Sequence, residues 1–492
     1  MKTSQITLST ALALLSYGSI ASQAIDYGTL KNQSKGESYC LTPVKDSAEV
    51  ALLACDGSTS QNWSIVASPA NHYFIHNQEF KNSCLRTFSH DGARMVKLST
   101  CSGDGYTSMR LWTINYNADG SIKLGNKYNN DLGKYETLDF DVNTDAIKMS
   151  AKNNEPRSRW NFSGEPSSLK KPLIGNKKVL LMATHFNGES PTEPERIRKA
   201  VFGDGDDSSS LQHYLKLASN EKLTIDGTFL SNINIGARPS SCNAGTILEN
   251  ARHAAREKGI EPNNYDYLFV DITRSSACKW EGHAATPGNW ILSNSVGYKY
   301  WMWSHEFGHN IGLKHSTTLR KCPINNGVVE INNHCVSGGG EDATDTMGGG
   351  GGKLYPVSYQ LFAGWLENND VPLIRTPGTY KLMPLWQQGG PQGYRIQRSD
   401  GSVLVLEFRQ PQSGFENWAK ESPFVNGITV RIAKSTGNTL TNTLIDATPN
   451  SALGMKDAPL MPGHSLYDSL SGKLITLISA DSSGAIIQVD NK

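Results

Sequence analysis

Residues 305–315 read HEFGHNIGLKH and are the segment of this sequence best suited to chemistry. His305 and His309 are four residues apart, so on a helix they project from one face, one turn apart. Two imidazole nitrogens at this spacing can reach a single ion at about 2.0–2.1 Å, the usual zinc–nitrogen distance. The pattern therefore predicts a helix that carries two ligands of one catalytic Zn²⁺.

The residues around this pair complete the predicted site. Gly312 can adopt a positive φ and end the helix, after which the chain turns and His315 can approach as a third ligand. Glu306 follows the first ligand directly and is placed to take a proton from the attacking water. An alternative third ligand is a glutamate further along the chain, and Glu330 is the nearest. His315 is preferred because it already stands at a suitable spacing.

An α/β sheet domain is predicted to carry this segment, because strand-like and helix-like patterns alternate before it. Asparagine, glycine and apolar positions at 243–259 predict an amphipathic helix that ends at Gly259. The predicted strands are 177–183, 223–235, 267–272 and 290–292, and the predicted helices are 195–202, 210–218 and 243–258. The short run 290–292 is expected to be an edge strand that holds an extended substrate.

The long histidine motif resembles the metzincin metalloproteases, whose signature also includes a methionine turn. Met347, within DATDTMG at 342–348, is the candidate for that turn, and the resemblance implies an apolar base beneath the metal ligands. HEFGHNIGLKHS at 305–316 and YPVSYQLFAGWL at 355–366 bring the resemblance closest to the gametolysin-like secreted peptidases, over about 175–490. Gly349 stands where astacin- and serralysin-like enzymes carry a tyrosine.

The first third of the chain contains an internal repeat with a period of 48–49 residues. Each copy ends in a tryptophan, Trp63, Trp112 or Trp160, and the first two copies begin with Cys-Leu. A threefold period with short β runs predicts a closed, pseudo-threefold β structure with one tryptophan per repeat in a shared core. The pattern resembles the ricin-type β-trefoil lectins, although only the first repeat keeps the full Q-x-W signature.

Sugar binding by this module depends on an acidic residue after the Cys-Leu pair, as the lectin resemblance implies. Thr42 and Arg86 stand at that position in the first two repeats, and only Asp139 in the third is acidic. A carboxylate there could accept hydrogen bonds from sugar hydroxyls. We predict that any glycan contact involves Asp139, with an ordinary turn residue as the alternative.

The N-terminus and the cysteines indicate export. Lys2, the apolar stretch 6–20 and the small residues before 25 predict a signal peptide over 1–24, too short to span a bilayer. The eight cysteines form no C-x-x-C pair, which argues against a structural zinc site and favours disulfides. The simplest pairing, which sequence alone leaves open, is Cys40–Cys55, Cys84–Cys101, Cys242–Cys278 and Cys322–Cys335.

The remaining composition sets the domain organisation and limits the partners. The 492 residues carry 47 Lys+Arg and 46 Asp+Glu, which gives no electrostatic basis for capturing nucleic acid. Short β runs after residue 373, separated by turn residues, predict an all-β, sandwich-like C-terminal domain. The expected multidomain order is a signal peptide (1–24), an all-β trefoil (25–165), an α/β metzincin-type domain (172–372) and the C-terminal β domain (373–492).

Together these features predict a secreted zinc endopeptidase acting on extracellular proteins or glycoproteins, with a lectin-like targeting module and no membrane span. Two alternatives remain: a glycan-binding adhesin with an inactive protease domain, and a mucin-directed zinc metalloprotease. The acidic run 204–207 is a candidate calcium site that nothing else in the sequence tests.

Overall fold

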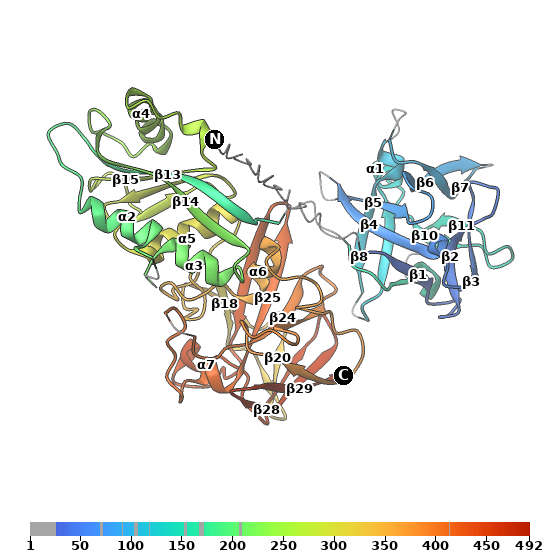
Figure 1. The fold of residues 1–492 in the computed structure, drawn as a ribbon. Helices are drawn as coiled ribbons and strands as arrows, with labels where there is room; N and C mark the ends of the chain where they lie inside the picture. Colours follow the sequence, from blue (N-terminus) through green and yellow to red (C-terminus); the bar gives the residue numbers. More distant parts are fainter. Residues whose placement is uncertain are drawn as a thin grey trace, which may run out of the picture.

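A computed structural model describes residues 26–492 except 69–71, 91, 103–106, 118, 152–154, 167–171, 206–208 and 413. The predicted signal peptide and part of the acidic run 204–207 lie outside the described residues. The chain is mostly β. Figure 1 shows the N-terminal β module apart from a green α/β layer, and the orange-to-red C-terminal sheets directly against that layer.

The N-terminal module is a β-trefoil built from three groups of four strands. Strands β1, β4, β5, β8, β9 and β12 pair successively into a closed ring, and each repeat adds one hairpin. The strands are β1 (Gly28–Asn32), β2 (Tyr39–Pro43), β3 (Val50–Ala54), β4 (Asn62–Ser68), β5 (His72–Asn77), β6 (Ser83–His90), β7 (Ala93–Thr100), β8 (Trp112–Tyr116), β9 (Ile122–Asn126), β10 (Thr137–Phe140), β11 (Ile147–Ser150) and β12 (Trp160–Phe162). Short helical turns are η1 (Thr59–Gln61), η2 (Thr107–Arg110), α1 (Lys127–Asp131) and η3 (Pro156–Ser158).

The three tryptophans play the same structural part in each repeat. Trp63, Trp112 and Trp160 are fully buried in one apolar core. Each indole Nε1 donates to the backbone oxygen of the leucine that opens its own repeat, over 2.8–3.0 Å. A buried indole needs such an acceptor, so the repeat seen in the sequence is the repeat of a hydrogen-bonded core.

The central domain is a five-stranded sheet with order β14–β13–β15–β17–β16. Its strands are β13 (Gly175–His185), β14 (Leu223–Asn234), β15 (Tyr267–Ile272), β16 (Gly282–Ala284) and β17 (Trp290–Asn294). Its helices are α2 (Pro194–Phe202), α3 (Leu211–Ala218), η4 (Pro262–Asn264), α4 (Ala244–Glu257), α5 (Tyr300–Ile311) and α6 (Val357–Ala363). One apolar core includes residues of α2, α3 and α5 and another includes α4, so helices cover both faces of the sheet.

The edge of this sheet is not where the sequence predicted it. The run at 290–292 belongs to β17, which pairs with β15 on one side and with β16 on the other. The edge strand is β16, a short segment of glycine, histidine and alanine with little β propensity of its own. Pairing with β17, rather than local preference, fixes β16 in place.

The C-terminal region packs two six-stranded sheets face to face, because one apolar cluster draws residues from both. The first contains β21 (Val336–Gly339), β18 (Thr317–Arg320), β26 (Thr439–Ile445), β25 (Ile428–Thr436), β24 (Val403–Phe408) and β23 (Gly393–Gln397). The second contains β19 (Ile324–Asn325), β20 (Val328–Ile331), β27 (Ser465–Asp468), β28 (Lys473–Asp481), β29 (Gly484–Asn491) and β22 (Gly378–Leu382). Short helices α7 (Pro423–Asn426) and η5 (Gly454–Asp457) lie between strands.

The predicted boundary at 372/373 does not separate the sheets. Strands β18 and β20 precede it, yet β18 pairs with β26 and β20 pairs with β27. Ile331 packs in the core of the sandwich, so burial of apolar side chains holds this early segment there. Residues 317–339, which directly follow the histidine motif in sequence, therefore belong to the C-terminal sheets.

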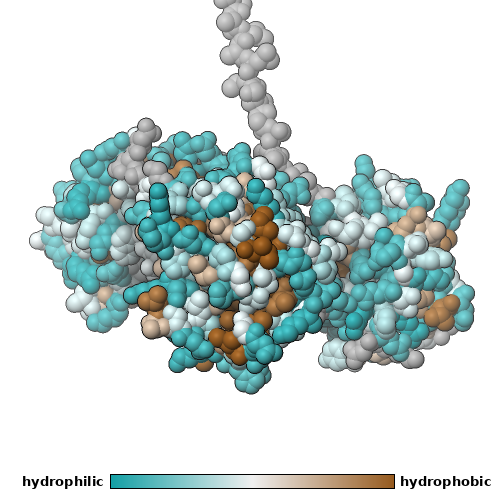
Figure 2. Space-filling model, turned by 90° about the horizontal axis from the view of Figure 1, so that it is seen from below, coloured by the Kyte–Doolittle hydropathy of each residue, from teal (hydrophilic) through white to brown (hydrophobic). Residues whose placement is uncertain are grey.

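Contacts and surface complete the picture. Arg395 of β23 forms a bidentate ion pair with Glu165, at 2.6 and 2.8 Å, and so joins the C-terminal sheets to the segment after the trefoil. No helix within the described residues is long and apolar enough to cross a membrane. Figure 2 shows a largely hydrophilic face with small, separated apolar patches.

Candidate metal centre

Helix α5 presents the histidine motif from a buried support. Trp303, Phe307 and Ile311 point into the main apolar core, which leaves His305 and His309 on the opposite, half-buried face. The helix ends at Gly312, whose φ of +105° is open to glycine at little cost. The chain then reverses, as the sequence predicted.

The turn brings the three predicted ligands together. Nε2 of His315 lies 3.2 Å from Nε2 of His309 and 3.1 Å from Nε2 of His305. Tetrahedral ligands with zinc–nitrogen bonds of about 2.0–2.1 Å are separated by about 3.3–3.4 Å, so this spacing fits one zinc ion. Glu330 lies on β20, at the surface, and pairs with Lys492.

The backbone fixes which nitrogen of each imidazole is free. Nδ1 of His305 lies 2.8 Å from the carbonyl oxygen of Thr346, and Nδ1 of His309 lies 2.8 Å from that of Leu313. A carbonyl can only accept, so both Nδ1 atoms carry hydrogen and both Nε2 atoms offer lone pairs. Such carbonyl partners orient metal-binding histidines.

Burial also keeps two of these side chains neutral. It lowers the pKa of His305 below its usual value and that of His309 to about 4. A neutral imidazole is the form that binds metal. Two Nε2 lone pairs therefore lie within 3.1–3.2 Å of Nε2 of a third imidazole, and the residues present fit a metal ion.

Glu306 lies next to His305 in the sequence, and its side chain is buried. The side chain is 6% exposed, and burial raises its pKa to about 8. Its Oε2 has no hydrogen-bond partner among the described residues. A Cβ added at Gly282 would lie 2.4 Å from Oε1 of Glu306, so the edge strand β16 packs directly over the carboxyl group. This carboxyl therefore lies buried beside the imidazoles, without an ion-pair partner among the described residues.

Met347 lies beneath the ligand helix. A Cβ added at Gly308 would lie 2.4 Å from its sulfur, which places the thioether against α5 between the two ligand turns. The backbone of the same turn contacts both ends of the motif, because Thr346 accepts from His305 and Met347 accepts from the amide of Ser316 at 3.0 Å. The thioether therefore packs beneath the helix that carries His305 and His309, and its role as a methionine turn stays a prediction.

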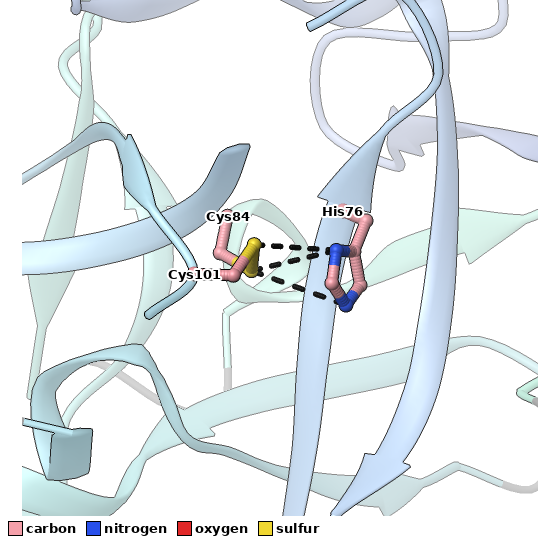
Figure 3. Close-up of side chains that lie close together, drawn as sticks. All are labelled: His76, Cys84 and Cys101. Carbon is pink, nitrogen blue, oxygen red and sulfur yellow. Dashed lines mark hydrogen bonds between the residues drawn. A yellow bond between two sulfur atoms is a disulfide. The ribbon is translucent and has the colours of Figure 1, made fainter. Parts of the chain in front are cut away.

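A second group of possible ligands lies in the trefoil (Figure 3). Nδ1 of His76 is 3.3 Å from Sγ of Cys101 and 3.6 Å from Sγ of Cys84. The two sulfurs are bonded to each other, so no thiolate is available to hold zinc. The structure forms all four disulfides of the simplest pairing, Cys40–Cys55, Cys84–Cys101, Cys242–Cys278 and Cys322–Cys335.

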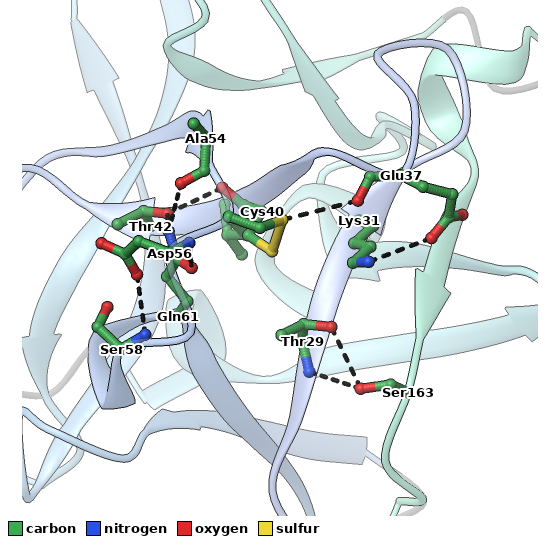
Figure 4. Close-up of a disulfide and its surroundings, with 12 residues drawn as sticks. Thr29, Lys31, Glu37, Cys40, Thr42, Ala54, Asp56, Ser58, Gln61 and Ser163 are labelled. Carbon is green, nitrogen blue, oxygen red and sulfur yellow. Dashed lines mark hydrogen bonds and ion pairs between the residues drawn. A yellow bond between two sulfur atoms is a disulfide. The ribbon is translucent and has the colours of Figure 1, made fainter.

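The trefoil position predicted to contact sugar is buried. In the first repeat Thr42 stands there, and Gln61 of the Q-x-W signature donates to its hydroxyl at 3.2 Å and to Ala54 O at 2.8 Å (Figure 4). Asp139 of the third repeat is 0% exposed and lies 3.4 Å from Nε of Arg157. Burial raises the pKa of Asp139. The structure thus places Asp139 inside the repeat and does not present it as an open sugar acceptor.

Comparison with known proteins identifies the central segment. Residues 178–321 match the gametolysin peptidase family, M11. The match includes the three histidines and Glu306 and confirms the predicted resemblance. At the level of an M11 family, it supports a metallopeptidase and implies a bound metal. The matched segment is less than half of the chain, and no curated protein matches it significantly.

The similar solved structures each match 28–30% of this chain. They include a mosquitocidal holotoxin (24% identity, 28% of this chain and 17% of that chain, TM-score 0.25) and the designed three-fold symmetric protein ThreeFoil (15%, 28% and 96%, 0.24). Another is the agglutinin of Abrus precatorius (14%, 30% and 51%, 0.22). The chain thus spans a small part of the first of these. At such scores, the trefoil rests on this chain's own strand pairing and tryptophan hydrogen bonds.

Two parts of the candidate site have no signal in the motif. The strand over Glu306 is β16, whose composition does not predict a strand. Backbone atoms of Glu281 and Ala285 bond to β17, so by alternation those of Gly282 and Ala284 face the free edge. The partner of His305 is the backbone oxygen of Thr346, which no residue pattern reveals. Asp204, in the acidic run considered as a calcium site, forms ion pairs with Arg198 and Lys199. We do not assign a calcium ion to it.

Proposed function

We propose that this protein is a secreted zinc endopeptidase that hydrolyses peptide bonds of extracellular proteins or glycoproteins. The observation that carries the proposal is the convergence of three Nε2 atoms, at 3.1–3.2 Å, beside a buried carboxyl with an unpaired oxygen. His305, His309 and His315 hold the metal in this proposal, and Glu306 is the general base. Four disulfides and the match to a metallopeptidase family agree with an exported enzyme.

The chain's own groups divide the work. The free edge of β16 holds an extended substrate by hydrogen bonds from the backbone of Gly282 and Ala284. A zinc ion held by the three imidazoles would polarise the scissile carbonyl and make the attacking water more acidic. Glu306 accepts the proton of that water and passes it to the leaving amine. Burial favours the protonated form of this carboxyl, and a bound cation would favour the ionised form that accepts the proton.

The zinc content and activity of three variants test this assignment. His309→Ala should lose most of the metal that the wild-type protein binds, about one zinc per chain. Glu306→Gln should keep zinc and fold but lose at least about 10²-fold in turnover of casein or a peptide. His253→Ala is the matched control, because that histidine lies on α4 with 74% of its side chain exposed. Near-normal zinc in His309→Ala would refute the ligand assignment.

The trefoil is proposed to act as a targeting module that raises the local concentration of glycosylated substrate. The burial of Asp139 leaves the contact residues of this module unassigned. Glu306→Gln offers a clean test, because an inactive enzyme can be incubated with a glycan array without digesting attached protein. Failure to bind any glycan would make the trefoil a structural spacer.

The adhesin alternative is distinguished by the same variants. An inactive protease domain predicts that wild type and Glu306→Gln show equal, negligible turnover while both bind glycan. A mucin-directed protease predicts that wild-type turnover requires glycosylated substrate and fails on casein. Cleavage-site profiling on matched glycosylated and unglycosylated proteins separates these two alternatives from the proposal.

A further inference from the structure

A buried charge cluster joins the C-terminal sandwich to the methionine turn. Arg431, on β25, has no exposed surface, and its guanidinium lies against the loop 342–348. It forms an ion pair with Asp342 and donates to the hydroxyl of Thr344. Nη2 also donates to Oδ1 of Asp342 at 3.2 Å. The planar fork thus grips two side chains of one loop, a geometry that a lysine cannot reproduce.

The same loop carries the partner of a proposed metal ligand. Asp342 accepts the backbone amide of Thr344 at 3.0 Å, and Asp345 accepts that of Met347 at 2.8 Å. Between them, Thr346 presents the oxygen that lies 2.8 Å from Nδ1 of His305. Hydrogen bonds to and within this loop, together with its backbone, therefore connect Arg431 to the imidazole of His305.

A second carboxylate, that of Glu407, contacts Nε of the Arg431 guanidinium. Nε of Arg431 lies 3.4 Å from Oε1 of Glu407, which also accepts from Nε of Arg409 at 3.0 Å. The other oxygen of Glu407 accepts the amide of Val357 at 2.8 Å. Although burial opposes ionisation, the two arginines lower the pKa of Glu407 to about 2, so it stays charged. Asn442, on β26, adds a second contact, to Asp345 at 3.3 Å.

Buried ion pairs of this kind are a weak source of stability, because desolvation offsets their attraction. Their stronger effect is to fix geometry. We propose that Arg431 is a positioning residue for the metal centre: it holds the loop 342–348 and thereby orients His305. The C-terminal sandwich is then a working part of the catalytic unit. This inference rests on the proposed function, since it concerns the proposed zinc ligands.

Arg431→Lys in the full-length protein tests the inference, with Arg398→Lys as the matched control. Arg398 is 5% exposed, pairs with buried Asp468 at 3.0 Å, and belongs to the same sandwich. Its guanidinium donates to Asp468 and Ser402, which lie outside the loop 342–348. The readouts are the rate at which zinc passes to a chelator, and kcat and KM on one peptide.

Arg431→Lys should release zinc about tenfold faster than wild type, the low end for a residue that orients a metal ligand. It should lower kcat with KM nearly unchanged, whereas Arg398→Lys should match wild type in all three values. Equal zinc release by the two variants would overturn the inference. If Arg431→Lys does not fold, Thr344→Val removes the hydroxyl's bonds to Arg431 and Asp342 but leaves the Arg431–Asp342 ion pair, and the same comparison decides.

Zinc binding and activity distinguish failure of the proposed function from failure of this inference. A wild-type protein that binds no zinc refutes the proposed function and this inference together. A wild-type protein that binds zinc and cleaves peptide, but whose Arg431→Lys and Thr344→Val variants retain it normally, refutes only the inference.

Discussion

Asp271 offers a quantitative test of the electrostatics that support the ligand helix. It lies one residue before the end of β15 with 1% exposure, and its Oδ1 accepts from Ser293 Oγ at 2.5 Å and from the amide of Gly297 at 2.9 Å. Gly297 in turn accepts from the indole of Trp303 on α5, at 2.6 Å. The other oxygen, Oδ2, has no hydrogen-bond partner among the described residues. Asp271→Asn keeps the two accepted bonds and removes the titration.

The magnitude follows from the shift in pKa. Burial raises the pKa of Asp271 from its ordinary 3.8 to about 7, only partly offset by its two hydrogen bonds. The folded state therefore binds this proton more tightly than the unfolded state does. The contribution to stability is fully present below about pH 4 and is lost as the pH rises through about 7. At about 1.4 kcal/mol per pH unit, the change approaches 4 kcal/mol.

Chemical denaturation of wild type and Asp271→Asn between pH 4 and 8 measures this term. The free energy of unfolding of the variant, relative to wild type, should rise by a few kcal/mol from pH 4 to 7 and then level off. Other titrating groups cancel in the difference. A buried amide without a partner adds a constant offset, so the slope decides. A pH-independent difference would refute the raised pKa, and a slope of opposite sign would refute the burial argument.

Further predictions concern packing and crosslinks. Gly282→Ala should displace the Glu306 carboxyl and lower kcat on a peptide, with zinc retained. Gly339→Ala is the control and should leave kcat unchanged, because an added Cβ there meets nothing within 4 Å. Equal kcat values for the two variants would contradict the packing of Gly282 against Glu306. Replacing Cys322 and Cys335 by alanine should cost about 3 kcal/mol in a denaturant titration, the entropy of a loop of that size; no loss would mean that the unfolded chain is little constrained by this crosslink. Asp139→Asn should leave peptide turnover unchanged, and altered peptide turnover would mean that the trefoil acts on the catalytic site itself.

Local patterns predicted the elements whose signal lies within one segment. Strand β15 matches the prediction at both ends, and α4 differs by one residue at each end, because apolar periodicity and a capping asparagine define them. The three histidines and Glu306 were predicted from local rules alone. Helix geometry places His305 and His309 on one face, and a glycine that ends the helix lets His315 return to them. The pairing of the cysteines was the simplest one available, and short loops made it correct.

The features that sequence missed depend on partners outside their own segment. Strand β16 exists because β17 pairs with it, and residues 317–339 join the sandwich because β26 and β27 offer free edges. Asp139 looked like a surface acceptor because its neighbours in sequence resemble lectin repeats. Its burial comes from the fold around the repeat, including Arg157, which lies 18 residues further on. No periodicity encodes such tertiary choices.

The same distinction explains why the metal centre needs more than its motif. The motif supplies donors, but a donor binds metal well only when its ring is held. Here His309 is oriented locally, by Leu313 four residues away, whereas His305 depends on Thr346, 41 residues away. The loop 342–348 is held by hydrogen bonds within it and by contacts from outside it, such as that of Arg431. Under the proposal for Arg431, a motif of eleven residues depends on a strand of the C-terminal sandwich to hold one of its three candidate ligands in place.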